Sequence, residues 1–238
     1  MKQTNRSKFL LNPKFQVIVT WVWNFLAALV IMAIVLIALP GNVVTNLETL
    51  REHPNYAIIP IFTEIIAAGL LPVLFTALNR EKIAQYGLQT KGLVKSLFLS
   101  ALVMIASFVI DSLKIGQVFE FSFSMLNLTS PWRMILALLA VVAYGPLEVF
   151  FFIWLVNNMD RILKSEDVLL SRGLILTTLI YGLLHTVSQG FNSLVIATIM
   201  FLLGLVYKHT RNSIGPMLAW TVRTKYIWFL VSVLLTKS

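Results

Sequence analysis

The chain has 238 residues, of which 58% are hydrophobic and 12% are charged, and its mean hydropathy is +0.84. Soluble domains are usually about 45–50% apolar and about 25% charged, so this composition excludes an ordinary soluble protein and predicts a polytopic membrane protein. The net charge of +9 comes from basic residues in short segments between apolar runs, which argues against nucleic-acid binding and indicates membrane topology. The chain has no cysteine, which excludes disulfides, thiol catalysis and cysteine-based zinc sites.

Seven apolar stretches approach the roughly 20 residues that a helix needs to cross a bilayer. They are Phe15–Leu39, Ala57–Leu78, Leu93–Leu113, Met134–Val156, Val168–Val187, Phe191–Tyr207 and Ile214–Leu235. The sixth stretch is short, and the seventh is interrupted by Arg223 and Lys225. We therefore expect an all-α fold, a polytopic transmembrane bundle of about seven spans, and a single membrane domain over residues 1–238 because no repeat is evident.

The distribution of basic residues indicates which loops face the cytoplasm. If the basic N-terminus, residues 1–14, is cytoplasmic, thirteen lysines and arginines lie on the inner side: Lys2, Arg6, Lys8, Lys14, Arg80, Lys82, Lys91, Lys95, Arg161, Lys164, Arg172, Lys208 and Arg211. Arg51, Lys114, Arg133 and Lys237 fall on the outer side, and Arg223 and Lys225 stay within the last span. The first apolar run is long and no small-residue cleavage site follows it, so we expect an uncleaved first span rather than a signal peptide.

Two segments have open interpretations. Glu64 in the second span is either a helix-packing carboxylate near the outer interface or a catalytic group, in a helix that Pro60, Gly69 and Pro72 allow to bend. The segment Lys114–Ser130 has phenylalanines at alternate positions, which suits either an extended segment or an interfacial amphipathic one.

A carboxylate, Glu148, lies in the middle of the fourth apolar run, two residues after Pro146. An ionisable side chain inside a bilayer is costly unless it is paired or hydrated, so Glu148 is a functional-site candidate that needs a partner. The proline frees a backbone carbonyl and can kink the helix close to the carboxylate.

Two further places put polar groups into the later spans. Tyr181 and His185 are four residues apart and share one helix face. Of the three histidines, only His185 lies in a predicted span, since His53 and His209 fall in loops. In the last stretch, polar side chains follow Trp220 at Thr221, Arg223 and Thr224.

A glutamate and a histidine that meet in a dry cavity suit general acid–base hydrolysis, because burial raises the pKa of a glutamate and the histidine can donate to an oxyanion or a leaving group. The alternative is an interhelical hydrogen bond that only joins two helices, worth about 0.6–2 kcal/mol in membranes. At about 1.5 Å per residue, Glu148 lies about 12 Å from the inner end at Val156 and His185 about 18 Å from a helix start at Gly173. Their pairing therefore requires that later start, a tilt, or a kink at Pro146.

At these residues the chain resembles the CPBP group of intramembrane proteases, which includes type II CAAX prenyl endopeptidases and bacteriocin-immunity proteins. The resemblance covers roughly residues 85–224. It rests on Pro146 to Phe152 for the family's Glu-Glu-x-x-x-Arg motif, on Tyr181-x-x-x-His185 for Phe-x-x-x-His, and on Trp220-x-x-x-Thr224 for His-x-x-x-Asn. The Tyr86-Gly87-Leu88 loop and the phrase Thr210 to Pro216 are also similar to family segments.

The resemblance implies a glutamate-activated water that attacks a peptide carbonyl, with histidines and an asparagine helping to polarise it. Only Glu148 and His185 match the family's catalytic positions, because the second glutamate, the arginine and the third-motif histidine are replaced. Tyr181, Trp220, Arg223 and Thr224 are candidate supporting residues. A catalytic zinc usually takes three protein ligands, so we expect no cofactor or bound metal, with zinc left open as the alternative.

Arg223 has two interpretations. In the first, Arg223 replaces the positive donor of the family's motif that this chain lacks. In the second, it either forms a salt bridge to Glu148 or Glu64 or extends to the inner interface.

Two functions follow from these residues. The first is an intramembrane peptidase of the plasma membrane that cleaves a membrane-anchored peptide or protein, with the lipid bilayer and no nucleic acid as partner. The second is an inactive relative that acts as a bacteriocin-immunity or scaffold protein. A small transporter has little support, since no inverted repeat or pair of broken helices is evident.

Overall fold

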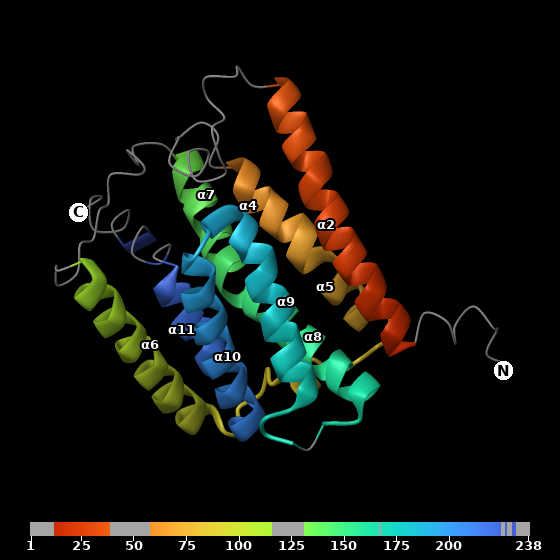
Figure 1. The fold of residues 1–238 in the computed structure, drawn as a ribbon, viewed down its shortest axis with the longest axis vertical. Helices are drawn as coiled ribbons and strands as arrows, with labels where there is room; N and C mark the ends of the chain where they lie inside the picture. Colours follow the sequence, from red (N-terminus) through yellow and green to blue (C-terminus); the bar gives the residue numbers. More distant parts are fainter. Residues whose placement is uncertain are drawn as a thin grey trace, which may run out of the picture.

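The computed structural model describes residues 12–38, 58–115, 131–166, 168–224, 227 and 230–231, and every regular element within these ranges is helical. In chain order they are α2 (Pro13–Ala38), α4 (Ile58–Glu64), η1 (Ile65–Gly69), α5 (Leu70–Leu78), η2 (Ile83–Tyr86), α6 (Leu93–Ile115), α7 (Pro131–Val142), η3 (Ala143–Leu147), α8 (Glu148–Leu163), α9 (Arg172–Gln189), α10 (Asn192–Thr210) and α11 (Ile214–Arg223) (Figure 1). The expected all-α membrane bundle is confirmed. The predictions for residues 1–11, for the loop with Arg51 and His53, for most of Lys114–Ser130 and for most of the chain after Thr224 lie outside the described residues.

Within the described ranges, five helical runs are long and apolar enough to cross a membrane. They are Pro13–Val35, Ile58–Leu78, Leu93–Leu113, Met134–Leu163 and Asn192–Thr210. They correspond to the first four and the sixth of the predicted stretches. The fifth stretch is helical as α9, but its threonines, Tyr181 and His185 reduce its hydropathy. The seventh begins as α11, whose ten residues are about half of a span.

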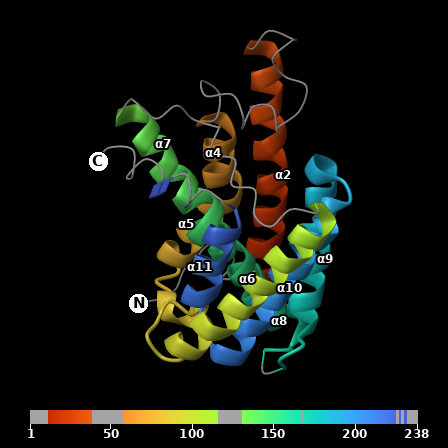
Figure 2. The same cartoon turned by 90° about the vertical axis from the view of Figure 1, so that its left-hand side faces the viewer.

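Helix α8 occupies the centre of the bundle, and α2 and α6 lie on opposite flanks (Figures 1 and 2). In the most apolar window of each span, 61% of the residues of the α7–η3–α8 run are buried, against 17% for α2 and 22% for α6. A helix that is apolar on all sides is stable only when surrounded by other helices or lipid, and in α8 all residues from Glu148 to Val156 are buried. The flanking helices expose leucine, isoleucine and valine instead, as expected for lipid-facing surfaces.

Close helix contacts depend on small residues. A Cβ atom added to Gly204 of α10 would meet the Leu174 Cδ1 of α9 at 2.4 Å, and one added to Gly215 of α11 would meet the Ser96 backbone oxygen of α6 at 2.5 Å. Helices in membranes associate through such close backbone approach, because lipid tails are as apolar as the side chains they replace. These glycines set the spacing of the helices around α8.

The connections α5–α6, α8–α9 and α10–α11 gather at one end of the bundle, the lower end in Figures 1 and 2, which we call the basic end (residues 79–92, 164–171 and 211–213). Asn212 joins two of these connections, because its side-chain amide donates to the Gln89 and Lys91 carbonyls. Burial, and then the hydrogen bond that it donates to Glu81, raises the pKa of Tyr86 well above its usual value, so its hydroxyl stays protonated near neutral pH. The basic segments that the sequence places on one side of the membrane therefore lie together.

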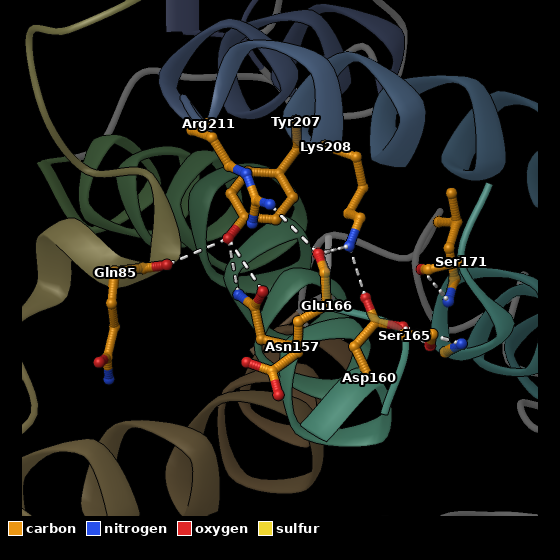
Figure 3. A network of polar contacts seen from close by, with 11 residues as sticks. Gln85, Asn157, Asp160, Ser165, Glu166, Ser171, Tyr207, Lys208 and Arg211 are labelled. Atoms are coloured by element: carbon orange, nitrogen blue, oxygen red, sulfur yellow. Dashed lines mark hydrogen bonds and ion pairs between the residues drawn. The ribbon is translucent and has the colours of Figure 1, made fainter. Parts of the chain in front are cut away.

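A buried ion pair anchors this end (Figure 3). Lys208 Nζ of α10 lies 2.8 Å from Asp160 Oδ2 of α8, and both side chains are 1% exposed. Lys208 also donates to the Glu166 carbonyl at 2.7 Å, and the other Asp160 oxygen accepts from Ser165 Oγ and from the Gly173 amide. A carboxylate at the first turn of α9 is favourable because of the free amides there. The pair thus joins α8, the start of α9 and the end of α10.

The predicted inner end of the fourth span at Val156 is wrong. Helix α8 continues to Leu163 because its polar residues find partners within the protein: Tyr207 donates to Asn157, and Asn158 donates to the Trp154 carbonyl. The predicted start of the fifth span at Val168 is also too early. Helix α9 starts at Arg172, where the Ser171 side chain caps the Leu174 amide.

Candidate active site

Glu148 is the first residue of α8 and directly follows η3, a π-helical turn that contains Pro146. A proline has no amide hydrogen, so the regular ladder of hydrogen bonds is interrupted there, and single π-helical turns are frequent at functional sites. The residue is 5% exposed, in the central helix. A carboxylate in this position needs hydrogen-bond donors from neighbouring helices.

Two neutral donors supply them. The Tyr181 hydroxyl of α9 donates to Glu148 Oε1, and Trp220 Nε1 of α11 donates to Glu148 Oε2 at 2.7 Å. Both donors are buried. The carboxylate therefore connects α8 with α9 through one oxygen and with α11 through the other.

His185 lies one turn beyond Tyr181 on α9 and faces the same carboxylate. Its Nε2 is 3.8 Å from Glu148 Oε1, and its Nδ1 is 2.9 Å from the Tyr181 carbonyl oxygen. A carbonyl accepts only, so Nδ1 carries a proton, and Nε2 is the ring nitrogen that faces Glu148. At 3.8 Å the two groups are beyond a direct hydrogen bond and close enough to share one water molecule.

Aromatic packing holds this face of α9 in place. The Tyr181 and His185 rings lie 4.2 Å apart between centroids, and the Phe152 ring meets the Tyr181 ring edge-on at 5.7 Å. Such contacts restrict both rings beyond what their hydrogen bonds do. The His185 side chain is 25% exposed, so it forms the accessible side of the site, whereas Glu148 forms its interior.

Two π-helical turns pack against each other behind Glu148. A Cβ atom on Gly69 of η1 would meet Leu147 Cδ2 of η3 at 2.3 Å, and one on Gly145 of η3 would meet Thr221 Oγ1 of α11 at 2.1 Å. Only glycine allows both approaches. The second approach brings α11 close enough for Trp220 to reach the carboxylate. Glu64 ends α4 next to η1 and is half-buried.

The observed helix ends place Glu148 and His185 at similar depths. Glu148 is 15 residues from the end of α8 at Leu163, about 22 Å, and His185 is 13 residues from the start of α9 at Arg172, about 20 Å. The sequence had predicted different depths for Glu148 and His185, because the fourth span was expected to end at Val156 and not at Leu163.

Two of the candidate supporting residues take other positions. Arg223 forms an ion pair with Asp111 of α6, with 2.7 Å between Nη2 and Oδ2, in place of the expected partners Glu148 or Glu64. Thr224 lies at the end of α11, where its hydroxyl donates to the Thr221 carbonyl at 3.1 Å. The structure therefore brings Glu148, Tyr181, His185 and Trp220 together and leaves Arg223 and Thr224 in separate contacts.

The sequence interpretation missed Asp111 and Gly145. Asp111 was detectable in principle, because a lone carboxylate in a predicted span needs a cationic partner just as Glu148 does. The role of Gly145 depends on a close helix contact that no local pattern reveals.

The side chains at the site do not match a catalytic zinc centre. Such a centre takes three protein ligands, whereas Glu148 and His185 supply two. Within the part of the chain that the structure describes, no three histidine, aspartate or glutamate side chains converge on one point. Tyr181 and Trp220 face the carboxylate as hydrogen-bond donors.

The fold and the site define a helical membrane protein in which a buried carboxylate faces a partly exposed imidazole. Residues 127–223 match the family model described as Rce1-like, type II CAAX prenyl endopeptidase. The matched segment contains Glu148, Tyr181, His185 and Trp220 and confirms the family resemblance over this part of the chain, whereas the Tyr86-Gly87-Leu88 loop lies before it. No curated protein and no solved structure matches the chain.

Proposed function

We propose that the protein is an intramembrane peptidase that cleaves a membrane-anchored peptide or protein, with Glu148 and His185 as its catalytic residues. The observation that carries the proposal is the 3.8 Å approach of His185 Nε2 to Glu148 Oε1 inside the helix bundle. The Rce1-like match over the same residues supports a hydrolytic reaction.

In this proposal a water molecule binds between Glu148 and His185. Glu148 accepts one proton from the water as its oxygen attacks the peptide carbonyl, so a C–O bond forms and the carbonyl electrons move to the oxygen. His185, when Nε2 carries a proton, stabilises this oxyanion. Glu148 then returns the proton to the amide nitrogen as the C–N bond breaks.

The exposure of the two groups gives the direction of approach. Because His185 is the more exposed member of the pair, the substrate carbonyl reaches the site from the His185 side. Tyr181 positions the carboxylate, since its hydroxyl donates to the oxygen that faces His185. We propose the plasma membrane as the location, and we place the basic end in the cytoplasm on the distribution of lysine and arginine.

A second function has support from one observation. Both Glu148 oxygens already accept hydrogen bonds, and the residue is 5% exposed, as in a carboxylate that only joins three helices. The protein would then be a bacteriocin-immunity or scaffold protein that binds a partner without hydrolysis.

The test is cleavage of single-span membrane peptides by the purified protein in liposomes, followed by mass spectrometry. We expect Glu148→Gln and His185→Ala to reduce the rate by about 10²–10⁴-fold, the usual contribution of a general acid or base. Glu81→Gln is the matched control, because it removes a carboxylate that pairs with Arg161 in a different part of the chain. If both site variants cleave at the wild-type rate, the peptidase proposal is wrong.

A further inference from the structure

An open groove of about 300 Å³ lies between α6 and α10, and none of its lining residues belongs to the Glu148 site. Leu99, Leu102 and Val103 of α6 form one wall, and Leu205 and other apolar residues of α10 form the opposite wall. Leu169 of the α8–α9 connection completes it, and His209 is its polar residue. On α10 the groove runs from Leu202 to His209, which is about 10 Å.

The groove begins at the basic end of the bundle. Helices α6 and α10 touch there, since a Cβ atom on Gly92 would meet the Thr210 carbonyl oxygen at 2.4 Å. His209 lies in the last turn of α10, next to this contact, and Leu169 comes from a connection at the same end. The remaining lining residues extend from there into the membrane-spanning part of both helices, α6 and α10, which run side by side (Figures 1 and 2).

Donors and positive charge gather at this end of the groove. Lys95 is exposed and lies one turn before Leu99 on α6. Because helical side chains lean toward the N-terminus of their helix, the Lys95 side chain extends toward the basic end. His209 is exposed as well. Lys164 and Arg172, both exposed, flank the connection that contributes Leu169, and the sequence between them carries two acidic residues, Glu166, which is exposed, and Asp167. An apolar channel with a cationic mouth is complementary to an amphiphile with an anionic head.

We propose that this groove is a specific site for an anionic glycerophospholipid. One acyl chain lies between α6 and α10, and the phosphate binds Lys95 and His209 at the basic end. Each methylene group of the acyl chain that enters the groove adds apolar contact with the protein. The positive charge at the mouth of the groove favours anionic over zwitterionic head groups.

Native mass spectrometry of the full chain with phosphatidylglycerol or phosphatidylcholine tests this site. We expect the protein to retain phosphatidylglycerol in preference, and Lys95→Gln to weaken that preference about fivefold, the effect of one basic group at a membrane surface. Leu102→Trp, which fills the groove, is expected to reduce retention of both lipids at least about tenfold.

Two controls separate a site from general contact with lipid. Lys14→Gln removes the same charge from α2, on the opposite flank, and Ile105→Trp adds the same bulk to an exposed position of α6 outside the groove lining. Both are expected to leave retention unchanged. The proposal is overturned if the two lipids are retained equally, if Lys14→Gln acts like Lys95→Gln, or if Ile105→Trp acts like Leu102→Trp. The glutamine variants alter exposed residues, so they stay informative if Leu102→Trp fails to fold.

Discussion

At the scale of single residues, the question is how Glu148 is tolerated inside the bundle. Placing a carboxylate at the centre of a membrane helix costs about 2.5–3.5 kcal/mol on insertion scales. A hydrogen bond to a charged group contributes about 1.5–3 kcal/mol, so the donors Tyr181 and Trp220 are together sufficient to offset that cost. His185 is then available for chemistry, because the position of the carboxylate does not depend on it.

Removing the donor of Trp220 leaves one buried carboxylate oxygen without that hydrogen bond. We expect Trp220→Phe to reduce the free energy of unfolding in detergent by about 1–3 kcal/mol more than Trp154→Phe does. Trp154 is the matched control, because it is also buried and its indole nitrogen has no hydrogen-bond partner among the residues that the structure describes. Equal losses for the two variants would show that the Trp220 hydrogen bond does not hold Glu148.

The sequence predicted part of this site. Helical spacing placed Tyr181 and His185 on one face, and the cost of a buried charge identified Glu148. The position of Trp220 followed from its place in a family motif. Asp111 was recognisable as a carboxylate in need of a partner, but its pairing with Arg223 was not predictable, because only the packing of α6 against α11 brings the two side chains together.

At the scale of elements, contacts at the basic end determine where α8 ends, where α9 begins and where α10 ends. The sequence interpretation ended the fourth span at Val156, because the residues that follow are polar and such residues usually mark a loop. They remain helical since their hydrogen-bond partners lie on α9, α10 and the connection between α8 and α9, most clearly at Asp160. Such partners are a tertiary property, so the boundary could not be read from the local pattern.

Breaking the buried pair should be costly. We expect Lys208→Met to lower the free energy of unfolding by about 3–5 kcal/mol, because the Asp160 charge is left buried without its partner. Adding Asp160→Asn to the same chain removes that charge, so we expect the double variant to recover part of the loss. Arg161→Met is the control, since the pair of Arg161 with Glu81 is partly exposed and pairs of that kind contribute about 1 kcal/mol or less. A loss for Lys208→Met no larger than that for Arg161→Met would contradict this role.

At the scale of the whole molecule, composition predicted the membrane bundle, and hydropathy located its most apolar spans. It was less informative for α9, where the polar residues of the site reduce the apolar signal. Of the three helices that carry the site, α8 lies in a span that hydropathy recognises within the described ranges, whereas α9 and α11 do not.

The absence of cysteine allows a direct test of topology. We expect Asn12→Cys, Lys82→Cys and Lys164→Cys to react with a membrane-impermeant maleimide from the cytoplasmic side, and Phe191→Cys to react from the opposite side. Phe191 is 92% exposed in the connection between α9 and α10, so its accessibility reports whether α9 crosses the membrane. Labelling of Phe191→Cys and Lys164→Cys from the same side would show that it does not.

The most direct test of the account is a double-mutant cycle on peptide cleavage with Glu148→Gln, His185→Ala and the combined variant. Residues that act on one water molecule act as a unit, so we predict that the combined variant is about as slow as the slower single variant. Multiplicative losses, or a wild-type rate in either single variant, would contradict the claim that Glu148 and His185 form one catalytic pair.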